Sequence, residues 1–548
     1  MVEEKKLLIR GLLFAGLMYL CATVIFFYPC LKDLGSSLIG PPEDNMRNLW
    51  DIWWAHKVFI GHDGSLFFTR YLYFPEGSTL LYHSVSFFNL FITLCAAPLR
   101  NPVLVYNLLV LHTFVVAGLG AYLLIRHLTK DHLASLCGGF VFAFNPWHFI
   151  QALHHYEIAS IQFIPFFVLF FLKSVKGPLG KNYMLAAFFF LLNAACTWYY
   201  FVFNIYFLLF YYIYVAWKEK RFFLKDLFVR SAGIVGATLV VFSPWILRMV
   251  ILVLRSHRQI PMPGHDIFVA DLYSFIVPNP YHLLGQFKGI PGIFRTFTGN
   301  DWEKTAYLGI ANILLIAVAF KGVIRKTWHY LVGLFCFLVL SMGASLHVMG
   351  KQLPVFLPYA FLVNIPFFSN ARVPSRIMVY AYLFLAVLVA FSFSYLRTRI
   401  NSVCLRRFLS LLVVSLVVLD YSSLCKENTL AYVPACYSVI KKEDKSFGIL
   451  DLPLKGWENN ARYMMYQTYH GFPIVQGAIA HKPEFSFIDA LGNSDLALQK
   501  EGLKANGIKY VVVHKDLFGS QLPVDLPVLR QTCATVYSDQ ESEVFRVY

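Results

Sequence analysis

Charged side chains and nucleotide-binding motifs are what this sequence has least of. Only 14% of the 548 residues are charged, against roughly 25% in a typical soluble domain. No GxxxxGK[ST], GxGxxG or HExxH motif occurs, which argues against a nucleotide-driven machine. The 10 cysteines include no CxxC pair and lie mostly in apolar runs. We interpret them as small core residues, with a Cys425–Cys436 disulfide as an open alternative.

Apolar residues, by contrast, make up 58% of the chain, which has a mean hydropathy of +0.57 and 17% aromatic residues. This composition is that of a polytopic membrane protein. The net charge of +16 does not indicate nucleic-acid binding, because the lysines and arginines cluster in short loops between apolar runs. In such loops they set membrane topology.

Eleven apolar runs have the length of membrane spans. They cover residues 11–29, 102–125, 133–149, 158–172, 182–197, 200–217, 231–252, 305–320, 328–347, 374–396 and 408–424. The short run Val85–Leu99 contains Pro98, and we interpret it as a half-buried interfacial helix. The basic loops then all fall on the side of the N-terminus. The positive-inside rule therefore predicts a multi-pass protein of the plasma (inner) membrane, with its N-terminus in the cytoplasm and its C-terminus outside.

The expected fold class is an α-helical polytopic membrane protein with a C-terminal soluble α/β domain. Residues 1–425 would hold the spans and a large first outer loop (30–101), and residues 426–548 would form the extracytoplasmic domain. Within that domain, SFGILDLPL, IKYVVVHKD and SEVFRVY have the pattern of strands, the last at an edge, and LALQKEGLKANG has that of a helix. A strand–helix–strand order favours a small α/β domain.

The segment that follows the first span holds the leading candidate site. It begins with the adjacent carboxylates Glu43 and Asp44 and continues as a Trp-rich amphipathic helix. We expect this helix to lie flat at the membrane surface, its indoles at headgroup depth, with Arg47 and Asp51 paired on the other face. The alternative is that Asp44 or Asn45 simply caps the helix. A capping carboxylate is also held rigidly, as a general base must be.

Other outer loops hold further candidates. Glu76 belongs to the turn YFPEG and could share a crevice with His83, although a purely structural turn is the alternative. His154, His155 and Glu157 lie between two predicted spans and could bind a phosphate or a metal ion.

The last candidates stand before the eighth and tenth spans. Glu303 is either a site residue or part of a solvated helix start. Arg372 and Arg376 break the positive-inside pattern at the mouth of a span. A guanidinium at a helix N-terminus opposes the helix dipole, so an anionic partner such as a phosphate is expected. The alternative is that both arginines snorkel to anionic lipid headgroups.

Short motifs along most of the chain carry a family resemblance. They are EDNMRNLWDIWW, YFPEGSTLLYHS, FAFNPWHFIQALHHYE, EKTAYLG, ARVPSR and QTYHGFPIVQG. Together they resemble the GT-C fold of polyprenyl-phosphate-dependent glycosyltransferases, and within it the YfhO-like and mannosyltransferase-type bacterial membrane proteins. The resemblance implies that Asp44, beside Glu43, is the catalytic base and that Arg372 and Arg376 bind the donor phosphate. A magnesium or manganese ion, with Asp44 and Glu157 as ligands, is left open.

The sequence therefore predicts a GT-C-type hexosyltransferase of the cell envelope, which would invert the anomeric carbon because one base and one displacement act. Its partners would be a polyprenyl-phosphate-linked sugar, membrane lipids and a glycan, lipid or protein acceptor, but no nucleic acid. A lipid or polysaccharide transporter or flippase would need charges inside the spans, which are nearly free of them. A non-enzymatic cell-envelope assembly protein, with the acids as ordinary caps, is the second alternative.

Overall fold

The chain packs into two compact units. The computed structural model describes residues 2–256, 264–363, 365, 371–440, 447–454, 456–479, 482–483, 487, 500–518 and 526–548. The helical unit holds Met1–Lys32, Leu109–Ile246 and Val253–Lys426, and the sheet unit holds Asp33–Leu108, Leu247–Leu252 and Glu427–Tyr548. The sheet unit thus combines most of the predicted first loop with the C-terminal tail. The division into domains at residue 425 stays a prediction.

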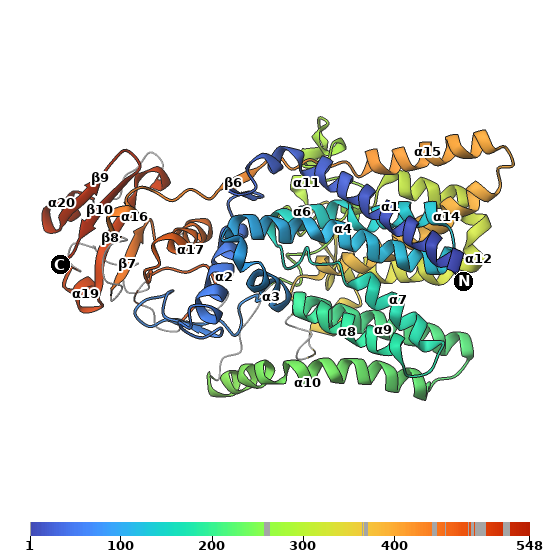
Figure 1. Ribbon diagram of the computed structural model, residues 1–548, viewed down its shortest axis with the longest axis horizontal. Helices are drawn as coiled ribbons and strands as arrows, with labels where there is room; N and C mark the ends of the chain where they lie inside the picture. The colour runs from blue at the N-terminus through green and yellow to red at the C-terminus, as the bar shows by residue number, and fades with distance from the viewer. Residues whose placement is uncertain are drawn as a thin grey trace. The chain divides into compact units, whose positions relative to one another are not determined.

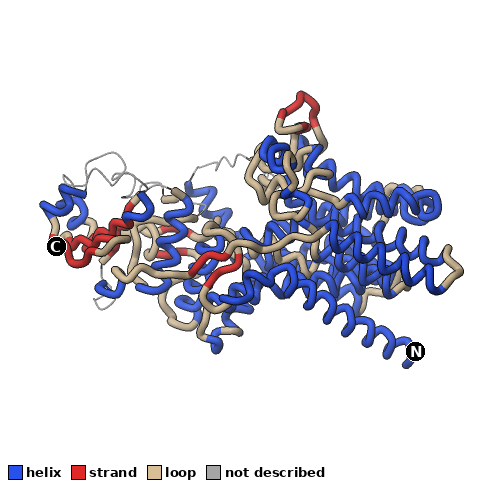
Figure 2. The backbone as a smooth tube through the Cα atoms, turned by 90° about the horizontal axis from the view of Figure 1, so that it is seen from above, coloured by secondary structure: helices blue, strands red, loops and turns tan. Residues whose placement is uncertain are grey.

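Long apolar helices dominate the helical unit (Figure 1). Its helices are α1 (Val2–Phe27), α4 (Pro102–Thr129), α5 (His132–Ala143), α6 (Pro146–His154), α7 (Ile164–Val175), α8 (Lys181–Cys196), α9 (Trp198–Glu219), α10 (Lys225–Ser256), α11 (Ile290–Thr296), α12 (Ile310–Ser341), α13 (Tyr359–Val363), α14 (Met378–Thr398) and α15 (Val403–Asp420). Short 3-10 turns are η1 (Tyr28–Asp33), η3 (Leu272–Phe275), η4 (Leu284–Gln286) and η6 (Pro374–Ile377). The strands β4 (Ser345–Val348) and β5 (Lys351–Phe356) form a hairpin that stands away from these helices (Figure 2).

Several of these helices can cross a membrane. Among the described residues, 6 helices are long and apolar enough, or up to 7 if α5 and α6 count as one span bent by 42°. Pro146 begins α6 and lacks the N–H that would continue α5, which explains the bend. The helices α7 and α8, at predicted spans four and five, are apolar but shorter. The protein is therefore a multi-pass membrane protein, as the composition predicts.

Two predicted spans, 305–320 and 328–347, fall largely within the single 32-residue helix α12. A straight helix of that length would measure about 48 Å. However, Leu308 N–H donates to Phe275 O, and Ala270 N–H donates to Ser341 O, so both ends are bonded to the same short segment. The helix therefore turns back on itself. Its second arm runs antiparallel to α14, since Tyr330 lies against Phe391 while Phe337 lies against Tyr380.

The helix α14 is the core of the helical unit. It is apolar on all sides, and its residues from Met378 to Ala390 are all buried. A helix without a polar face is stable only when other elements surround it, and α5 and α12 pack on it. A disulfide joins Cys30, after α1, to Cys425, after α15. The alternative pairing of Cys425 with Cys436 is therefore wrong, and Cys436 is a free, buried thiol.

The sheet unit contains a four-stranded sheet in the order β7-β8-β10-β9. Its strands are β7 (Gly448–Leu452), β8 (Ile508–His514), β9 (Ala534–Ser538) and β10 (Ser542–Arg546). β7 and β8 are parallel, and the other pairs are antiparallel. The sequence pattern predicts β7, β8 and β10 correctly but misses β9. Because β9 pairs with the outer side of β10, the prediction that β10 is an edge strand is wrong.

The remaining elements of this unit surround the sheet or belong to the first loop. They are β1 (Ser37–Ile39), α2 (Asp44–Phe59), β2 (Phe68–Thr69), β3 (Ser78–Thr79), α3 (Phe87–Cys95), η2 (Ala97–Leu99), β6 (Asn428–Leu430), α16 (Tyr437–Ile440), α17 (Trp457–His470), α19 (Lys500–Ala505), η8 (Lys515–Phe518) and α20 (Leu526–Thr532). The predicted helix LALQKEGLKANG begins outside the described residues and continues as α19. With nine residues, α3 is too short to cross a membrane. β1 pairs with β6, which ties the first loop to the tail.

Candidate functional site

The two adjacent carboxylates of the sheet unit stand at the start of α2. Glu43 occupies the N-cap position but makes no side-chain capping bond, and Asp44 is the first helical residue. Asn45 Oδ1 accepts a hydrogen bond from the backbone N–H of Glu43 at 3.1 Å. The N-cap position thus falls on Glu43, one residue before the predicted Asp44 or Asn45, and the Asn45 side chain bonds back to the backbone of that residue. The Asp44 carboxylate has other contacts.

Two side chains hold the Asp44 carboxylate. Trp457 Nε1–H, at the start of α17, donates to Asp44 Oδ1 at 2.9 Å. Arg47 Nη1, one helical turn away, lies 3.7 Å from the same oxygen. The Asp44 side chain nevertheless keeps 14% of its surface exposed. Its carboxylate is thus oriented and partly neutralised, yet not fully buried.

Two of the three tryptophans of α2, Trp50 and Trp54, are buried inside the protein. Trp50 is fully buried and donates from Nε1 to Gln467 Oε1 of α17 at 2.6 Å. Trp54 is buried too and stacks on Trp50 at a centroid distance of 5.6 Å. Packing within the sheet unit therefore replaces the expected headgroup contact.

Asp51 also departs from expectation. It bonds to His83 Nε2 at 2.7 Å instead of pairing with Arg47, and both residues of the pair are buried. Glu76 is exposed in the turn that precedes β3, whereas His83 is buried against Asp51. No described contact joins Glu76 to His83. The buried Asp51–His83 pair orders the loop against α2.

The helical unit brings several predicted residues into one cluster. Arg376 Nε donates to Glu303 Oε1 at 2.9 Å, and its Nη2 donates to the same oxygen at 2.5 Å. Glu303 Oε2 accepts from Ser375 Oγ at 3.1 Å and from Gln151 Nε2 at 3.4 Å. The Glu303 side chain is only 2% exposed and that of Arg376 12%. The anionic partner expected for Arg376 is therefore a buried carboxylate of the protein.

The two histidines lie beside this pair. His155 Nε2 is 3.9 Å from Glu303 Oε1. His154 stacks on Trp302 with ring centroids 4.1 Å apart, which orients the loop residue next to Glu303. Sequence reasoning had selected His154, His155, Glu303 and Arg376 separately, and the fold joins them.

Two cations of this cluster share one tyrosine. The Arg376 guanidinium lies 4.7 Å from the centre of the Tyr199 ring, on α9. Arg372 also interacts electrostatically with the Tyr199 side chain and is half-buried. Arg372 has no carboxylate partner among the described ion pairs, in contrast to Arg376. Tyr199 is a residue that sequence reasoning missed, because nothing in an aromatic-rich span marks it.

Burial and charge act in opposite directions on Glu303. Burial alone would raise the pKa of this carboxyl, because the charged form loses its hydration. The Arg376 guanidinium, aided by His155 and Ser375, outweighs burial and lowers the pKa below its usual 4.5. Glu303 is therefore ionised at neutral pH and serves as a fixed counter-charge.

The described residues do not form a metal centre. No three His, Cys, Asp or Glu side chains among them lie close enough together to hold an ion. Asp44 belongs to the sheet unit, and Glu157, which is buried, belongs to the helical unit. A magnesium or manganese ion with Asp44 and Glu157 as ligands stays a prediction.

A further polar cluster lies inside the sheet unit. Asp451, at the end of β7, accepts a hydrogen bond from Tyr437 Oη and lies 3.0 Å from His514 Nε2 on β8. All three side chains are buried, so this cluster is closed to a substrate. It joins α16 to two neighbouring strands.

Comparison with known proteins supports the fold. The arabinofuranosyltransferase AftD from Mycobacteria matches with a TM-score of 0.58 and 12% identity, over 98% of this chain and 40% of that one. The oligosaccharyltransferase of Archaeoglobus fulgidus in the apo form matches with a TM-score of 0.52 and 11% identity, over 98% of this chain and 74% of that one. The GT-C fold predicted from the sequence is thereby confirmed.

Comparison of sequences places the chain in a family. No protein of curated function matches it. A family model described as "Domain of unknown function (DUF6311)" matches residues 51–420, which is most of the chain. The protein belongs to this family, DUF6311.

Proposed function

We propose that this protein is a membrane glycosyltransferase that transfers a sugar from a polyprenyl-phosphate donor to an acceptor hydroxyl. The observation that carries the proposal is the GT-C fold, shared over 98% of the chain with an arabinofuranosyltransferase and an oligosaccharyltransferase. The position of Asp44 supports it, since this oriented and accessible carboxylate follows directly on the first span.

Asp44 is the proposed general base. Its carboxylate takes the proton of the acceptor hydroxyl while the hydroxyl oxygen bonds to the anomeric carbon of the sugar. The bond from that carbon to the phosphate oxygen breaks, and the lipid phosphate leaves with the electron pair. One displacement of this kind inverts the anomeric carbon. Trp457 orients the base through its N–H bond, and Glu43 beside it adds negative charge.

Arg372 is the proposed contact for a phosphate within the helical unit. Arg376 is occupied by Glu303, whereas Arg372 has no carboxylate partner among the described ion pairs and interacts with the side chains of Tyr199 and His265. A guanidinium suits a phosphate because its N–H groups match two phosphate oxygens. The pair Glu303–Arg376, with His155, would then fix the loop that presents Arg372.

The disulfide supports an extracytoplasmic location for this chemistry. Disulfides persist in oxidising compartments and are rare in the cytosol. Cys30 follows α1 and Cys425 follows α15, on the side to which the positive-inside rule assigns the outer loops. Nucleotide sugars are confined to the cytoplasm, so an outer sugar transfer requires a lipid-linked donor.

Replacement of Asp44 tests the proposal. A strain that lacks the protein should accumulate a polyprenyl-phosphate sugar, detectable by lipid mass spectrometry. Wild-type protein should consume that lipid in isolated membranes, and D44N and D44A should slow consumption by about 10²–10⁴-fold, the usual contribution of a general base. Glu458 offers a matched control, because it is an exposed acid beside Trp457 whose partner among the described ion pairs is Arg462, in a surface pair. E458Q should keep full activity.

Three outcomes separate the explanations. Loss in D44N and D44A, with E458Q unchanged and all variants equally abundant, supports the base. Full activity in both Asp44 variants rejects it. No accumulated lipid-linked sugar in the strain without the protein argues against glycosyl transfer altogether.

A further inference from the structure

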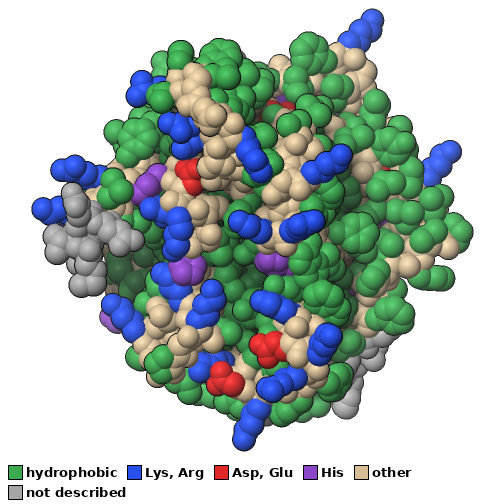
Figure 3. Space-filling view, turned by 90° about the vertical axis from the view of Figure 1, so that its right-hand side faces the viewer, with side chains coloured by type: hydrophobic (Ala, Val, Ile, Leu, Met, Phe, Trp, Pro, Cys, Tyr) green, Lys and Arg blue, Asp and Glu red, His purple; other side chains and the backbone are tan. Residues whose placement is uncertain are grey.

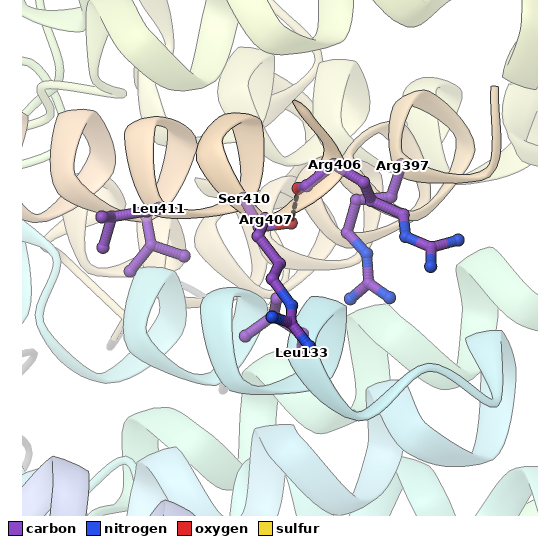
Figure 4. A pocket seen from close by; sticks show the side chains of 7 residues that line it. Leu133, Arg397, Arg406, Arg407, Ser410 and Leu411 are labelled. Atoms are coloured by element: carbon purple, nitrogen blue, oxygen red, sulfur yellow. Dashed lines mark hydrogen bonds between the residues drawn. The ribbon is translucent and has the colours of Figure 1, made fainter. Parts of the chain in front are cut away.

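A pocket of about 380 Å³ opens in the helical unit, away from the residues discussed above. It lies between the start of α5, the end of α14 and the first turns of α15 (Figure 4). Its lining consists of Leu133, Arg397, Arg406, Arg407, Ser410, Leu411 and Val414. The volume is in the range of small-molecule sites, about 300–1,000 Å³.

Three arginines dominate the polar side of this pocket, and only one has a counter-charge. Arg397 Nη1 lies 3.2 Å from Asp131 Oδ1, so its charge is balanced. Arg406 and Arg407 have no acidic partner in the part of the chain that the structure describes. Arg406 is half-buried, and the Arg407 side chain reaches from α15 toward Leu133 (Figure 4). The pocket therefore has a positive charge that the protein does not neutralise.

The other side of the pocket is apolar and continues along the exposed leucines of α15. Leu411 is 68% exposed, and Val414 stands next to it on the inner side of α15. Further along α15, Leu416 and Leu419 are also exposed, as expected for a helix in contact with acyl chains. Figure 3 looks at the right-hand side of Figure 1, where α14 ends, and shows lysines and arginines gathered there among apolar side chains. A ligand here would meet cations at one end and hydrocarbon at the other.

We propose that this pocket binds an anionic glycerophospholipid. The lipid's phosphodiester lies between the Arg406 and Arg407 guanidinium groups, and one acyl chain follows Leu411 and Val414. Charge complementarity selects the headgroup, because an anionic lipid brings a net negative charge to two cations that have no acidic partner among the described residues. A zwitterionic lipid carries its own ammonium group, which the arginines repel. A free phosphate lacks the apolar contact.

Lipid binding to the purified full-length protein in detergent tests this assignment. The measurement is native mass spectrometry with phosphatidylglycerol, with phosphatidylcholine of the same acyl chains, and with glycerol 3-phosphate. Wild-type protein should retain phosphatidylglycerol and should bind the other two at least tenfold more weakly. The variant R406Q/R407Q should bind phosphatidylglycerol roughly 30-fold more weakly, about fivefold for each arginine near a membrane surface.

A matched pair of cations outside the pocket provides the control. Arg325 and Lys326 are adjacent, exposed and absent from the pocket lining. R325Q/K326Q should therefore bind phosphatidylglycerol like the wild type. Equal loss in both double variants, or equal binding of the two phospholipids by wild-type protein, would overturn the proposal. Equal binding of glycerol 3-phosphate would reject the acyl-chain contact.

A thermal shift of the wild-type protein covers the case in which R406Q/R407Q does not fold. Phosphatidylglycerol should raise the melting temperature of the wild-type protein more than phosphatidylcholine does. The single variant R407Q, which changes an exposed residue, should lose most of that difference. A shift that is the same for both lipids contradicts the site.

Discussion

Removal of the Glu303 carboxylate should destabilise the helical unit strongly. The variant E303A leaves the Arg376 side chain, 12% exposed, without its counter-charge. It also removes the acceptor for Ser375 Oγ and Gln151 Nε2. Loss of one partner from a buried ion pair costs about 3–5 kcal/mol. We expect the free energy of unfolding to fall by about that amount.

A double variant tests whether the unpaired Arg376 charge causes this loss of stability. If the cost comes from an unpaired buried cation, then E303A/R376M should be more stable than E303A, because a buried pair can be replaced by apolar groups at little cost. Unfolding by sodium dodecyl sulfate in mixed micelles, followed by circular dichroism, measures both variants. E458Q, which breaks an exposed pair, should change stability by less than about 0.5 kcal/mol. A loss below about 1 kcal/mol in E303A, or strictly additive losses in the double variant, would refute the reasoning.

The same pair predicts the direction of a pH effect. The folded state holds the pKa of Glu303 below its usual 4.5, so the folded protein prefers the ionised carboxylate more than the unfolded chain does. The resulting stabilisation is present above that usual value and is lost as pH falls through the lower, folded value. The stability advantage of wild type over E303Q should therefore shrink as the pH is lowered through and below 4.5. An advantage that stays constant over this range contradicts the assignment.

Two further predictions concern the disulfide and the tryptophans of α2. Variants C30S and C425S should each free the partner thiol for a maleimide reagent in the unreduced, denatured protein, and each should lower the free energy of unfolding by about 2–4 kcal/mol. C436S should leave the disulfide intact. A free Cys425 in wild-type protein would contradict the pairing. W50F should lower the free energy of chemical unfolding by about 1–3 kcal/mol, because the buried Gln467 amide oxygen on α17 loses its N–H donor. W53F, at a half-buried position, should lower it clearly less. Equal losses would contradict the role of this bond.

Local patterns in the sequence were sufficient to predict most of the membrane helices and three of the four strands of the main sheet. Apolar runs mark the helices of the membrane, because each span must satisfy its own backbone hydrogen bonds inside hydrocarbon. Short apolar runs mark β7 and β8 in the same way, with β-branched residues dominating β8, since a buried parallel strand is largely apolar on both faces. The strand β9 was missed because its side chains are largely exposed and its pattern is that of a loop. The GT-C resemblance added the overall fold, which the comparison of structures confirms.

Pairings between distant residues were beyond the reach of the sequence. Asp44 meets Trp457 across 413 positions, and Cys30 meets Cys425 across 395. No local propensity encodes such distances. The amphipathic pattern of α2 is the same whether its indoles face lipid or another helix. Only packing against α17 shows that the Trp50 indole faces protein.

The charge on Arg376 shows the same limit. Its identity and its place at a helix start follow from the sequence, and so does the need for an anion. Whether that anion is a ligand or a side chain depends on where the loop with Glu303 folds, and only the tertiary structure determines this. The sequence thus determined which groups require partners, and the three-dimensional packing decided which partners they have, because desolvation and hydrogen bonding act through space and not along the chain.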